Sequence, residues 1–381
     1  MKKVMKMHKK LNLNFSLSDK ILFFLWGILI LINLVSRFWS SATDFYIKNI
    51  FPVISDFWCS ISGLFSFSVG EYMIVTGIML VILGILSFIL FMLFAGRHRK
   101  NIAKFYGRFY GWILTWLFFL LTFRFFILYQ GTQLSETLEN ISFQNSDVLD
   151  IYELLVTETN QISEQVSRDN SGHFVLSENT DIMAEAKACM KRLSEEFPQY
   201  KGVYPDAKPI AHSYFFTQQN LLGIYFPFSM EANYNPVVYE IHLPDTICHE
   251  FTHLKGNIFE DEAGYFAFRA CLTSDNPDFI YSGYISVLSW LDLDFGDDEA
   301  AWERYQEITS RLSPDVITDI YSYVPENYYQ THRHEEVIPT AIVSDIADNV
   351  IDANLKVNGI SEGSASYHGL TALVLYYYLC G

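Results

Sequence analysis

The chain has 381 residues and a formal net charge of −17; half of its residues are hydrophobic and 18% are charged. This composition excludes an intrinsically disordered protein, which needs low hydrophobicity, and a nucleic-acid-binding protein, which needs an excess of positive charge. The charge is divided unevenly: residues 1–130 carry 14 Lys and Arg against 4 Asp and Glu, and the remainder carries 12 against 39. The sequence therefore predicts two physically different parts that meet near residue 130.

Three apolar runs in the first part are long enough to be membrane-spanning helices. They occupy residues 21–39, 72–95 and 109–129, and about 20 apolar residues suffice to cross the hydrocarbon core of a bilayer. Arg124 is the single charged residue in the third run, and we expect its guanidinium to extend to the lipid headgroups. Residues 1–130 are therefore predicted to be a transmembrane anchor.

The positive charges predict how this anchor is oriented. The N-terminus and the connector over residues 97–108 are basic, whereas residues 41–71 hold one Lys and three acidic residues. By the positive-inside rule, the N-terminus and the connector are cytoplasmic and everything after residue 130 lies outside. A cleaved signal peptide is the alternative for the first run, and it would leave the later topology unchanged.

The second part is expected to be a polar stalk over residues 131–145 followed by an outer domain over residues 146–381. Aromatic and β-branched residues over 208–228 predict a strand or hairpin, and the remaining pattern is helical, so we expect a mostly α (α+β) domain with a small sheet. Five cysteines without CxxC spacing indicate no disulfide scaffold and assign no pairing. Helical spacing is found over residues 147–168, 181–197 (with Asn179 and Thr180 as its cap), 243–254, 260–272, 282–293, 299–310, 337–356 and 367–379.

Residues 249–253 are His-Glu-Phe-Thr-His, an HExxH motif. On a helix, positions i and i+4 share a face, so the imidazoles of His249 and His253 can bind one ion. Neutral imidazole suits Zn²⁺, and a carboxylate beside a zinc-bound water can take its proton as the water attacks a carbonyl. The motif therefore predicts Zn²⁺ held by His249 and His253, with Glu250 as the general base and later the proton shuttle to the leaving amine.

The residues around the motif favour a buried helix over a chance match on a protein surface. A surface helix would carry charged residues at the x positions, whereas the residues around and within this motif are mostly apolar or small. Pro244 and Asp245 stand where helices begin, and Gly256 stands where a helix would end.

A catalytic zinc site of this kind needs a third protein ligand. Residues 260–267 (EDEAGYFA) resemble the E-x-x-A-[N/D]-x-F-A helix that follows HExxH in gluzincin-type zinc peptidases. The resemblance implies that Glu260 is the third ligand, while Gly264 departs from the Asn or Asp of that pattern. Glu262, on a different helix face, is the alternative ligand; a solvated first turn, whose acids favour the helix dipole, is the plain structural explanation for both.

Nearly the whole chain also resembles an uncharacterised bacterial membrane-protein family that pairs three N-terminal spans with an outside HExxH domain. The resemblance rests on four segments of this sequence: FSFSVGE, YFPFSMEANYN, HEFTHLKG with EDEAGYFAF, and NLKVNGISEGSASYHG. It implies a multi-pass protein of the bacterial inner membrane with an extracytoplasmic, zincin-like domain, and it defines architecture rather than substrate.

Two further segments are candidates for contributing to the site. An edge strand within residues 225–235 would pair with an extended peptide, as it does in zincins, or it would form an ordinary core hairpin. Near the end of the chain, a donor that faces the zinc would stabilise the tetrahedral oxyanion. Tyr367 is the candidate for this catalytic role and His368 the alternative, although packing is the default use of a tyrosine.

Together these patterns predict a membrane-anchored zinc metallopeptidase that acts on a peptide or protein substrate and has no nucleic-acid partner. Its substrate specificity and oligomeric state are not predicted. Two alternatives stay open: a non-hydrolytic, zinc-binding membrane sensor or scaffold, and a hydrolase of cell-wall peptide amides. Glu250 favours catalysis, because a structural zinc site does not need a carboxylate at that position.

Overall fold

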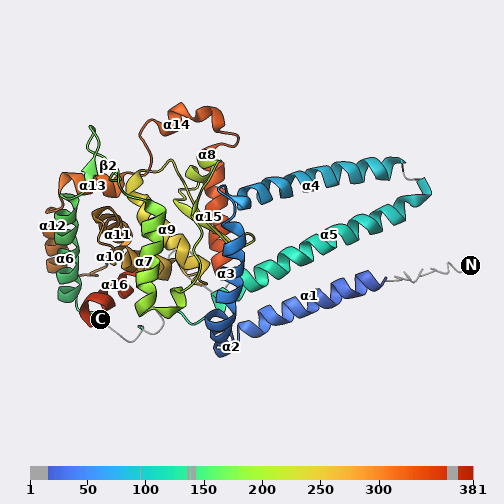
Figure 1. Cartoon of the computed structure of the whole chain (residues 1–381), viewed down its shortest axis with the longest axis horizontal. Helices are drawn as coiled ribbons and strands as arrows, with labels where there is room; N and C mark the ends of the chain where they lie inside the picture. The colour runs from blue at the N-terminus through green and yellow to red at the C-terminus, as the bar shows by residue number, and fades with distance from the viewer. Residues whose placement is uncertain (1–15, 95, 135–137, 139–142, 358–367, 381) are drawn as a thin grey trace, which may run out of the picture.

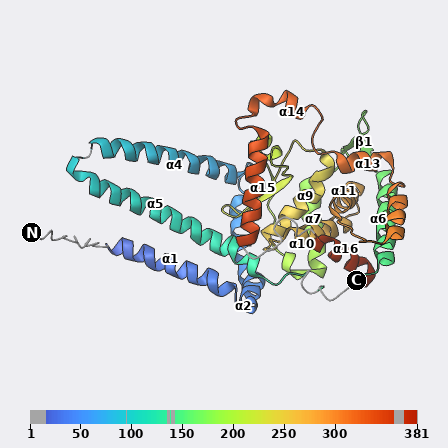
Figure 2. The same ribbon diagram turned by 180° about the vertical axis from the view of Figure 1, so that it is seen from behind.

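The computed structural model describes residues 16–94, 96–134, 138, 143–357 and 368–380. Within these residues the chain is mostly helical, with two small sheets. Figure 1 shows a bundle of three long helices that extends from one side of a larger helical body, and Figure 2 shows the same arrangement from behind. The N-terminal residues form the bundle, and the chain after residue 143 forms most of the body.

The three bundle helices are each long and apolar enough to cross a membrane. The three predicted apolar runs are thus confirmed as helices with the length and hydropathy of membrane spans, although the first helix ends at Ser36 instead of residue 39 and residue 95 lies outside the described residues; their sidedness stays a prediction. The spans are α1 (Leu17–Ser36), α4 (Val69–Phe94) and a helical stretch over Gly96–Gln130, which contains η2 (Gly96–His98), α5 (Arg99–Leu121), η3 (Thr122–Phe126) and η4 (Leu128–Gln130).

Helices that the sequence patterns did not predict connect the first span to the second. They are α2 (Ser40–Phe45), the π-helical η1 (Tyr46–Ile50) and α3 (Phe51–Ser62). A proline in its first turn favours the start of α3, and the helix runs crosswise to the spans at the junction between bundle and body (Figure 1). Phe51 and Cys59 of α3 belong to the main hydrophobic core of the body. Part of the N-terminal third is therefore built into the body.

Arg124 does not extend to lipid headgroups, contrary to our expectation. It is buried, and its Nη1 donates hydrogen bonds to the carbonyl oxygens of Phe228 at 2.8 Å and Pro227 at 3.3 Å. Its guanidinium also lies over the ring of Trp58, 4.3 Å from the centroid. Backbone acceptors of the body are in reach at this end of the span, so the charge is satisfied by protein instead of solvent.

The centre of the body is formed by α9, α10 and α11, which pack on one another, with α6, α7 and α16 around them. Phe251 of α9 and Phe268 of α10 are fully buried in this core. The helices of the body are α6 (Asn145–Ser163), α7 (Ile182–Glu196), η6 (Pro198–Tyr200), α8 (Ser213–Thr217), η7 (Glu240–His242), α9 (Leu243–Leu254), α10 (Glu260–Leu272), α11 (Pro277–Trp290), α12 (Glu299–Thr309), α13 (Pro314–Tyr321), α14 (Tyr328–Thr331), η8 (Arg333–Glu335), α15 (Thr340–Val357) and α16 (His368–Cys380).

A three-stranded sheet lies against α9, with strand order β3-β5-β4. β3 (Lys208–Pro209) is parallel to β5 (Glu231–Tyr234), and β4 (Gly223–Phe226) is antiparallel to β5, with Gly223 opposite Tyr234. Within the described residues β4 is an edge strand. The strand or hairpin expected over 208–228 is therefore only partly right, because α8 separates β3 from β4. The second sheet is the pair β1 (Ser167–Arg168) and β2 (Phe174–Val175).

The described residues of the predicted stalk make contacts with other parts of the chain. The Thr132 backbone N–H donates to the Asp44 carboxylate at 2.8 Å, the Leu134 backbone N–H donates to the Glu262 carboxylate, and Leu138 is buried. The division into anchor, stalk and outer domain stays a prediction, to which the structure adds these contacts across its boundaries.

Candidate metal centre

The HExxH motif occupies the last two turns of α9. Ile247, Cys248 and Phe251 are fully buried and fix this helix in the core, while Pro244 lies in its first turn. The helix ends at Leu254, and Gly256 follows with a φ of +94°, a conformation that favours glycine. The helix bounds and the stop at Gly256 agree with the sequence pattern.

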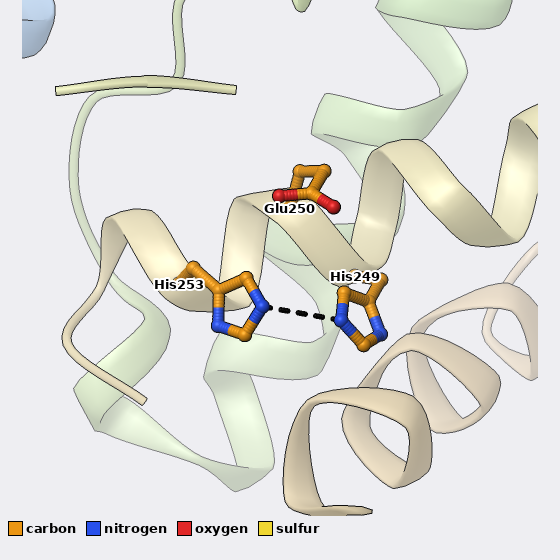
Figure 3. Close-up of side chains that lie close together, drawn as sticks. All are labelled: His249, Glu250 and His253. Carbon is orange, nitrogen blue, oxygen red and sulfur yellow. Dashed lines mark hydrogen bonds between the residues drawn. The ribbon is translucent and has the colours of Figure 1, made fainter. Parts of the chain in front are cut away.

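The two imidazoles of the motif face each other and a carboxylate from the next helix. His249 Nε2 and His253 Nε2 are 3.1 Å apart (Figure 3), and Glu260 Oε2 lies 3.0 Å from the first and 3.6 Å from the second. Donor atoms ~2.0–2.1 Å from a tetrahedral zinc ion are about 3.3–3.4 Å from one another. The three atoms therefore form a triangle of the size that a zinc ion needs, and these residues fit the metal.

The three side chains of this triangle differ in their exposure to solvent. The side chain of His253 is 5% exposed and that of His249 21% exposed, whereas that of Glu260 is 44% exposed. Glu260 is the first residue of α10, and the turn after Gly256 places it beside the two histidines. An exposed carboxylate beside one buried and one partly buried imidazole would leave room for solvent at a bound metal, as a catalytic site requires.

Glu262 lies near the site but outside the triangle. Its Oε1 accepts the backbone N–H of Leu134 and its Oε2 accepts Asn257 Nδ2 at 3.1 Å. The carbonyl oxygen of Asn257 in turn lies 2.7 Å from His253 Nδ1, which makes Nδ1 the donor and leaves Nε2 free to bind a metal. The contacts of Glu262 are therefore those of a residue that orients a ligand through its neighbour.

Glu250 lies on an adjacent side of α9 (Figure 3), and its ligand atom is within 4.8 Å of those of His249 and His253. The side chain is buried, and Oε2 makes no hydrogen bond to the part of the chain that the structure describes. Strand β4 passes directly over the carboxylate, since a Cβ added to Gly223 would lie 2.7 Å from Oε1. A buried carboxylate oxygen without a partner is suited to accept a proton from a bound water.

The charges in the site act on one another strongly. Burial raises the pKa of Glu250 to about 8, and burial lowers the pKa of His249. Burial opposes protonation of His253 as well, but the Glu260 carboxylate raises its pKa to about 9. Partial desolvation opposes ionisation of the half-exposed Glu260, yet the two imidazoles hold its pKa well below the usual range. Such perturbed groups are concentrated at functional sites.

The oxyanion donor predicted near the end of the chain is not placed by the structure. Tyr367 lies outside the described residues, and of His368 only the helical backbone at the start of α16 is described. That start does lie beside the site, because a Cβ added to Gly369 would be 1.8 Å from Oδ2 of Asp261, the neighbour of Glu260. The role proposed for Tyr367 stays a prediction.

The sequence patterns missed three contributors to this site. They gave no sign that the carbonyl of Asn257 would orient His253, because a backbone acceptor has no residue-type signal. They also did not single out Gly223, although a glycine within a strand pattern is a known sign of close backbone approach. The third contributor is α3, whose Ser55 Oγ donates to the Leu254 carbonyl at 2.5 Å.

The fold and the site together define a mostly helical protein with three helices suited to a membrane and a His-Glu-His cluster in the body. The chain belongs to the family described as "Protein of unknown function (DUF3810)", whose model matches residues 46–375. This match agrees with the resemblance to an uncharacterised family over most of the chain. No curated protein and no solved structure matches the chain.

Proposed function

We propose that the protein is a membrane-anchored metallopeptidase that binds Zn²⁺ through His249, His253 and Glu260. One observation carries the proposal: three donor atoms from α9 and α10 meet at separations of 3.0–3.6 Å, beside the buried carboxylate of Glu250. A surface salt bridge between a histidine and a glutamate would not explain why a second histidine and a buried, partnerless carboxylate oxygen share the same place.

Each residue has a defined task in this proposal. When bound, the zinc ion supplies a Lewis acid that polarises the scissile carbonyl and makes a water acidic. Glu250 Oε2 accepts the proton of that water and delivers it to the leaving amine. The Asn257 carbonyl holds His253 in the tautomer that presents Nε2. Strand β4, an edge strand over Glu250, offers an extended polypeptide a strand to pair with.

The alternatives predict different behaviour of the same site. A sensor or scaffold would use zinc as a closed structural centre, whereas the exposure of Glu260 and the unpaired oxygen of Glu250 favour an open one. A hydrolase of cell-wall peptide amides would use the same residues on another substrate, so cell-wall peptides belong in the assay.

The test uses the full-length protein in detergent micelles. We expect stoichiometric zinc, loss of the metal in His249→Ala and His253→Ala, and cleavage of a peptide library that a chelator stops. Glu250→Gln is expected to keep the metal and to lose at least about 100-fold in activity, the usual contribution of a general base. Glu303→Gln, an exposed carboxylate on α12, is the matched control and should behave as wild type.

Two outcomes would contradict the proposal. Undiminished cleavage by Glu250→Gln would show that the activity arises elsewhere. Stoichiometric zinc in a protein that cleaves neither the library nor cell-wall peptides would favour the sensor or scaffold.

A further inference from the structure

Helix α3 has two faces of different character. One face is buried against the body and holds Phe51, Ser55, Cys59 and Ser62. The opposite face is mostly apolar yet exposed: Val53 is 70%, Phe57 60% and Ile61 36% exposed, and the exposed Ser60 on this face donates its hydroxyl to the Asp56 carbonyl within the helix. Spacing of four residues places these three side chains in one stripe. The exposed apolar surface continues after the helix in Leu64, Phe65 and Phe67. We call the stripe of Val53, Phe57 and Ile61 the lower face of α3.

The lower face points to the side on which the spans lie. α3 comes between the end of α1 at Ser36 and the start of α4 at Val69, so the chain enters it from one span and leaves it into another. Figures 1 and 2 agree that α3 runs crosswise between the bundle and the body. Because its buried face packs on the body, the lower face is turned away from the body and towards the bundle.

Charge is absent from this lower face. Asp56 is the one charged residue within α3, and it forms an ion pair with Lys255 of the body at 2.7 Å. The carboxylate of Asp56 therefore pairs with the body, and the lower face carries no charged side chain that would need water. An apolar stripe of aromatic and branched residues, which the exposed Leu64, Phe65 and Phe67 extend towards α4, suits the boundary between headgroups and acyl chains.

The buried side of α3 supports the end of the metal-binding helix. Ser55 Oγ donates to the Leu254 carbonyl, and Asp56 pairs with Lys255. A Cβ added to Gly256 would lie 2.8 Å from the ring of Phe51, so the chain passes directly over that ring. These contacts begin one residue after His253. The candidate metal centre is therefore held in place by α3, so the position of α3 in the membrane determines the position of the centre.

We propose that α3 is an interfacial helix whose lower face is immersed in the outer leaflet, and that it holds the candidate metal centre just above the bilayer. The substrates are then polypeptide segments that lie next to a membrane anchor, which is either a transmembrane helix or an attached lipid. The assignment of this substrate class rests on the proposed function, whereas the immersion of α3 is independent of it.

The geometry sets the reach of such a centre. Interfacial helices sink about 5–10 Å into the headgroup boundary and a helix is about 10–12 Å across, so the end of α9 that contacts the buried face of α3 lies on the order of 10 Å above the lipid surface. An extended chain rises about 3.3 Å per residue, so about three residues bridge this height and cleavage is expected within the first few residues outside the membrane.

The immersion of α3 is tested by spin labels in the full-length protein, reconstituted in phosphatidylcholine vesicles. Cys380 is the exposed cysteine of the described chain and the other four are buried, so Cys380→Ser gives a background for single labels. Labels at Val53→Cys and Phe57→Cys are expected to collide more with oxygen, which partitions into lipid, than with a water-soluble nickel chelate. The control, Gln306→Cys on α12, lies on the far side of the body and should show the reverse (Figure 1).

Either of two other results overturns the immersion. Nickel accessibility equal to that of the control would place the lower face in water. Protection from both reagents would show that a protein, a second copy or a partner, covers the face instead of lipid.

The substrate class is tested with a peptide that the library assay identifies as cleaved. That sequence is placed at about 5 or about 40 residues from the span of a single-span reporter in the same vesicles, and the near reporter is expected to be cleaved about 10-fold faster, as the dependence of effective concentration on linker length predicts. Phe57→Asp should diminish this preference. Tyr321→Asp, which alters an even more exposed aromatic residue on α13, should retain it.

The two proposals fail separately. A wild-type protein that cleaves no soluble peptide would refute the proposed function, while the spin labels would still decide the position of α3. Equal cleavage of both reporters by an active enzyme would refute the substrate class alone.

Discussion

Glu260 and Glu262 are two positions apart on α10, yet their carboxylates have different partners. The first faces two imidazoles and is partly exposed, whereas the second is buried and accepts hydrogen bonds from Leu134 and Asn257. We expect Glu260→Gln to weaken zinc binding by more than the roughly 10–100-fold that is typical for a residue behind a ligand. Glu262→Gln should stay within that range. A competition titration with a chromogenic zinc chelator measures both.

The stability of the metal-free variants provides the control for this comparison. Glu262→Gln should lower the free energy of unfolding by about 1–3 kcal/mol, because either the Leu134 N–H or Asn257 Nδ2 loses its carboxylate acceptor. Glu260→Gln should also lower it, because the amide removes the charge that pairs with the two imidazoles, so zinc affinity and not stability separates the two variants. The reverse ranking in zinc affinity would make Glu262 the third ligand.

Two glycines near the site are expected to respond differently to alanine. A Cβ at Gly223 would lie 2.7 Å from Glu250 Oε1 and 2.9 Å from the Asn233 carbonyl, whereas a Cβ at Gly264 would meet Leu370 at an ordinary 3.8 Å. Gly223→Ala should displace Glu250 and reduce peptide cleavage while zinc stays bound. Gly264→Ala should keep activity and stabilise α10 by roughly 0.5–1 kcal/mol, as replacement of a helical glycine does. Cleavage rate, zinc content and the midpoint of thermal unfolding check the pair.

Sequence patterns identify single residues well where chemistry depends on spacing. His249 and His253 lie one helical turn apart, and their convergence follows from the helix alone. The choice between Glu260 and Glu262 does not follow, because positions i and i+2 differ by about 200° around a helix and the outcome depends on the turn over residues 255–259. Tertiary packing fixes that turn: Phe51, some 200 residues earlier in the chain, lies against Gly256. Spacing alone carries no such information.

Among the contacts between secondary-structure elements, a buried ion pair joins the second span to the body. Glu231 of β5 pairs with Lys208 of β3, and it also accepts the backbone N–H groups of Val69 at 3.2 Å and Gly70 at 2.8 Å in the first turn of α4. A carboxylate is well placed there, because the first turn of a helix has unpaired N–H groups and the positive end of the helix dipole. The pair therefore fixes where the span leaves the body.

Loss of this carboxylate charge is expected to be costly. Glu231→Gln leaves Lys208 buried and without a counter-charge, which should lower the free energy of unfolding by about 3–5 kcal/mol. Asp206→Asn is the matched control, since it removes the carboxylate of an exposed ion pair with Lys187 and should cost less than about 1 kcal/mol. Thermal unfolding in detergent compares them. Similar midpoints for the two variants would show that Glu231 is not needed to hold α4.

Elements were predictable where local and tertiary preferences agree. α9 and α10 have the bounds that the spacing of their apolar residues predicts, and α12 differs by one residue. α7 starts at the expected place, but its cap is Asp181, whose side chain accepts the Ala184 N–H, instead of Asn179 or Thr180. The helices over 40–62 were missed because they are short and because α3 buries small polar residues, Ser55 and Ser62, while its apolar stripe is exposed, which is the reverse of the pattern that marks a core helix. Within 208–228, packing of α8 overrides the β propensity of its aromatic residues.

Orientation is a property of the whole molecule, and the charge asymmetry between the two parts predicts it. The connector over 97–108 is at the end of the bundle far from the body (Figure 1), so the positive-inside rule places the body outside the cell. Cys380 makes this testable, because it is exposed while Cys59, Cys189, Cys248 and Cys271 are buried. A membrane-impermeant maleimide should therefore label intact cells that express the protein, and Cys380→Ser should abolish the labelling.

The connector supplies the complementary measurement. Lys104 is exposed on α5 near the far end of the bundle, so Lys104→Cys in the Cys380→Ser background should be labelled only after the membrane is permeabilised. The two sites must respond in opposite ways, because the bundle separates them by the length of a span. Labelling of Lys104→Cys in intact cells, together with protection of Cys380, would invert the topology. The candidate metal centre would then lie on the cytoplasmic surface, and α3 would be immersed in the inner leaflet.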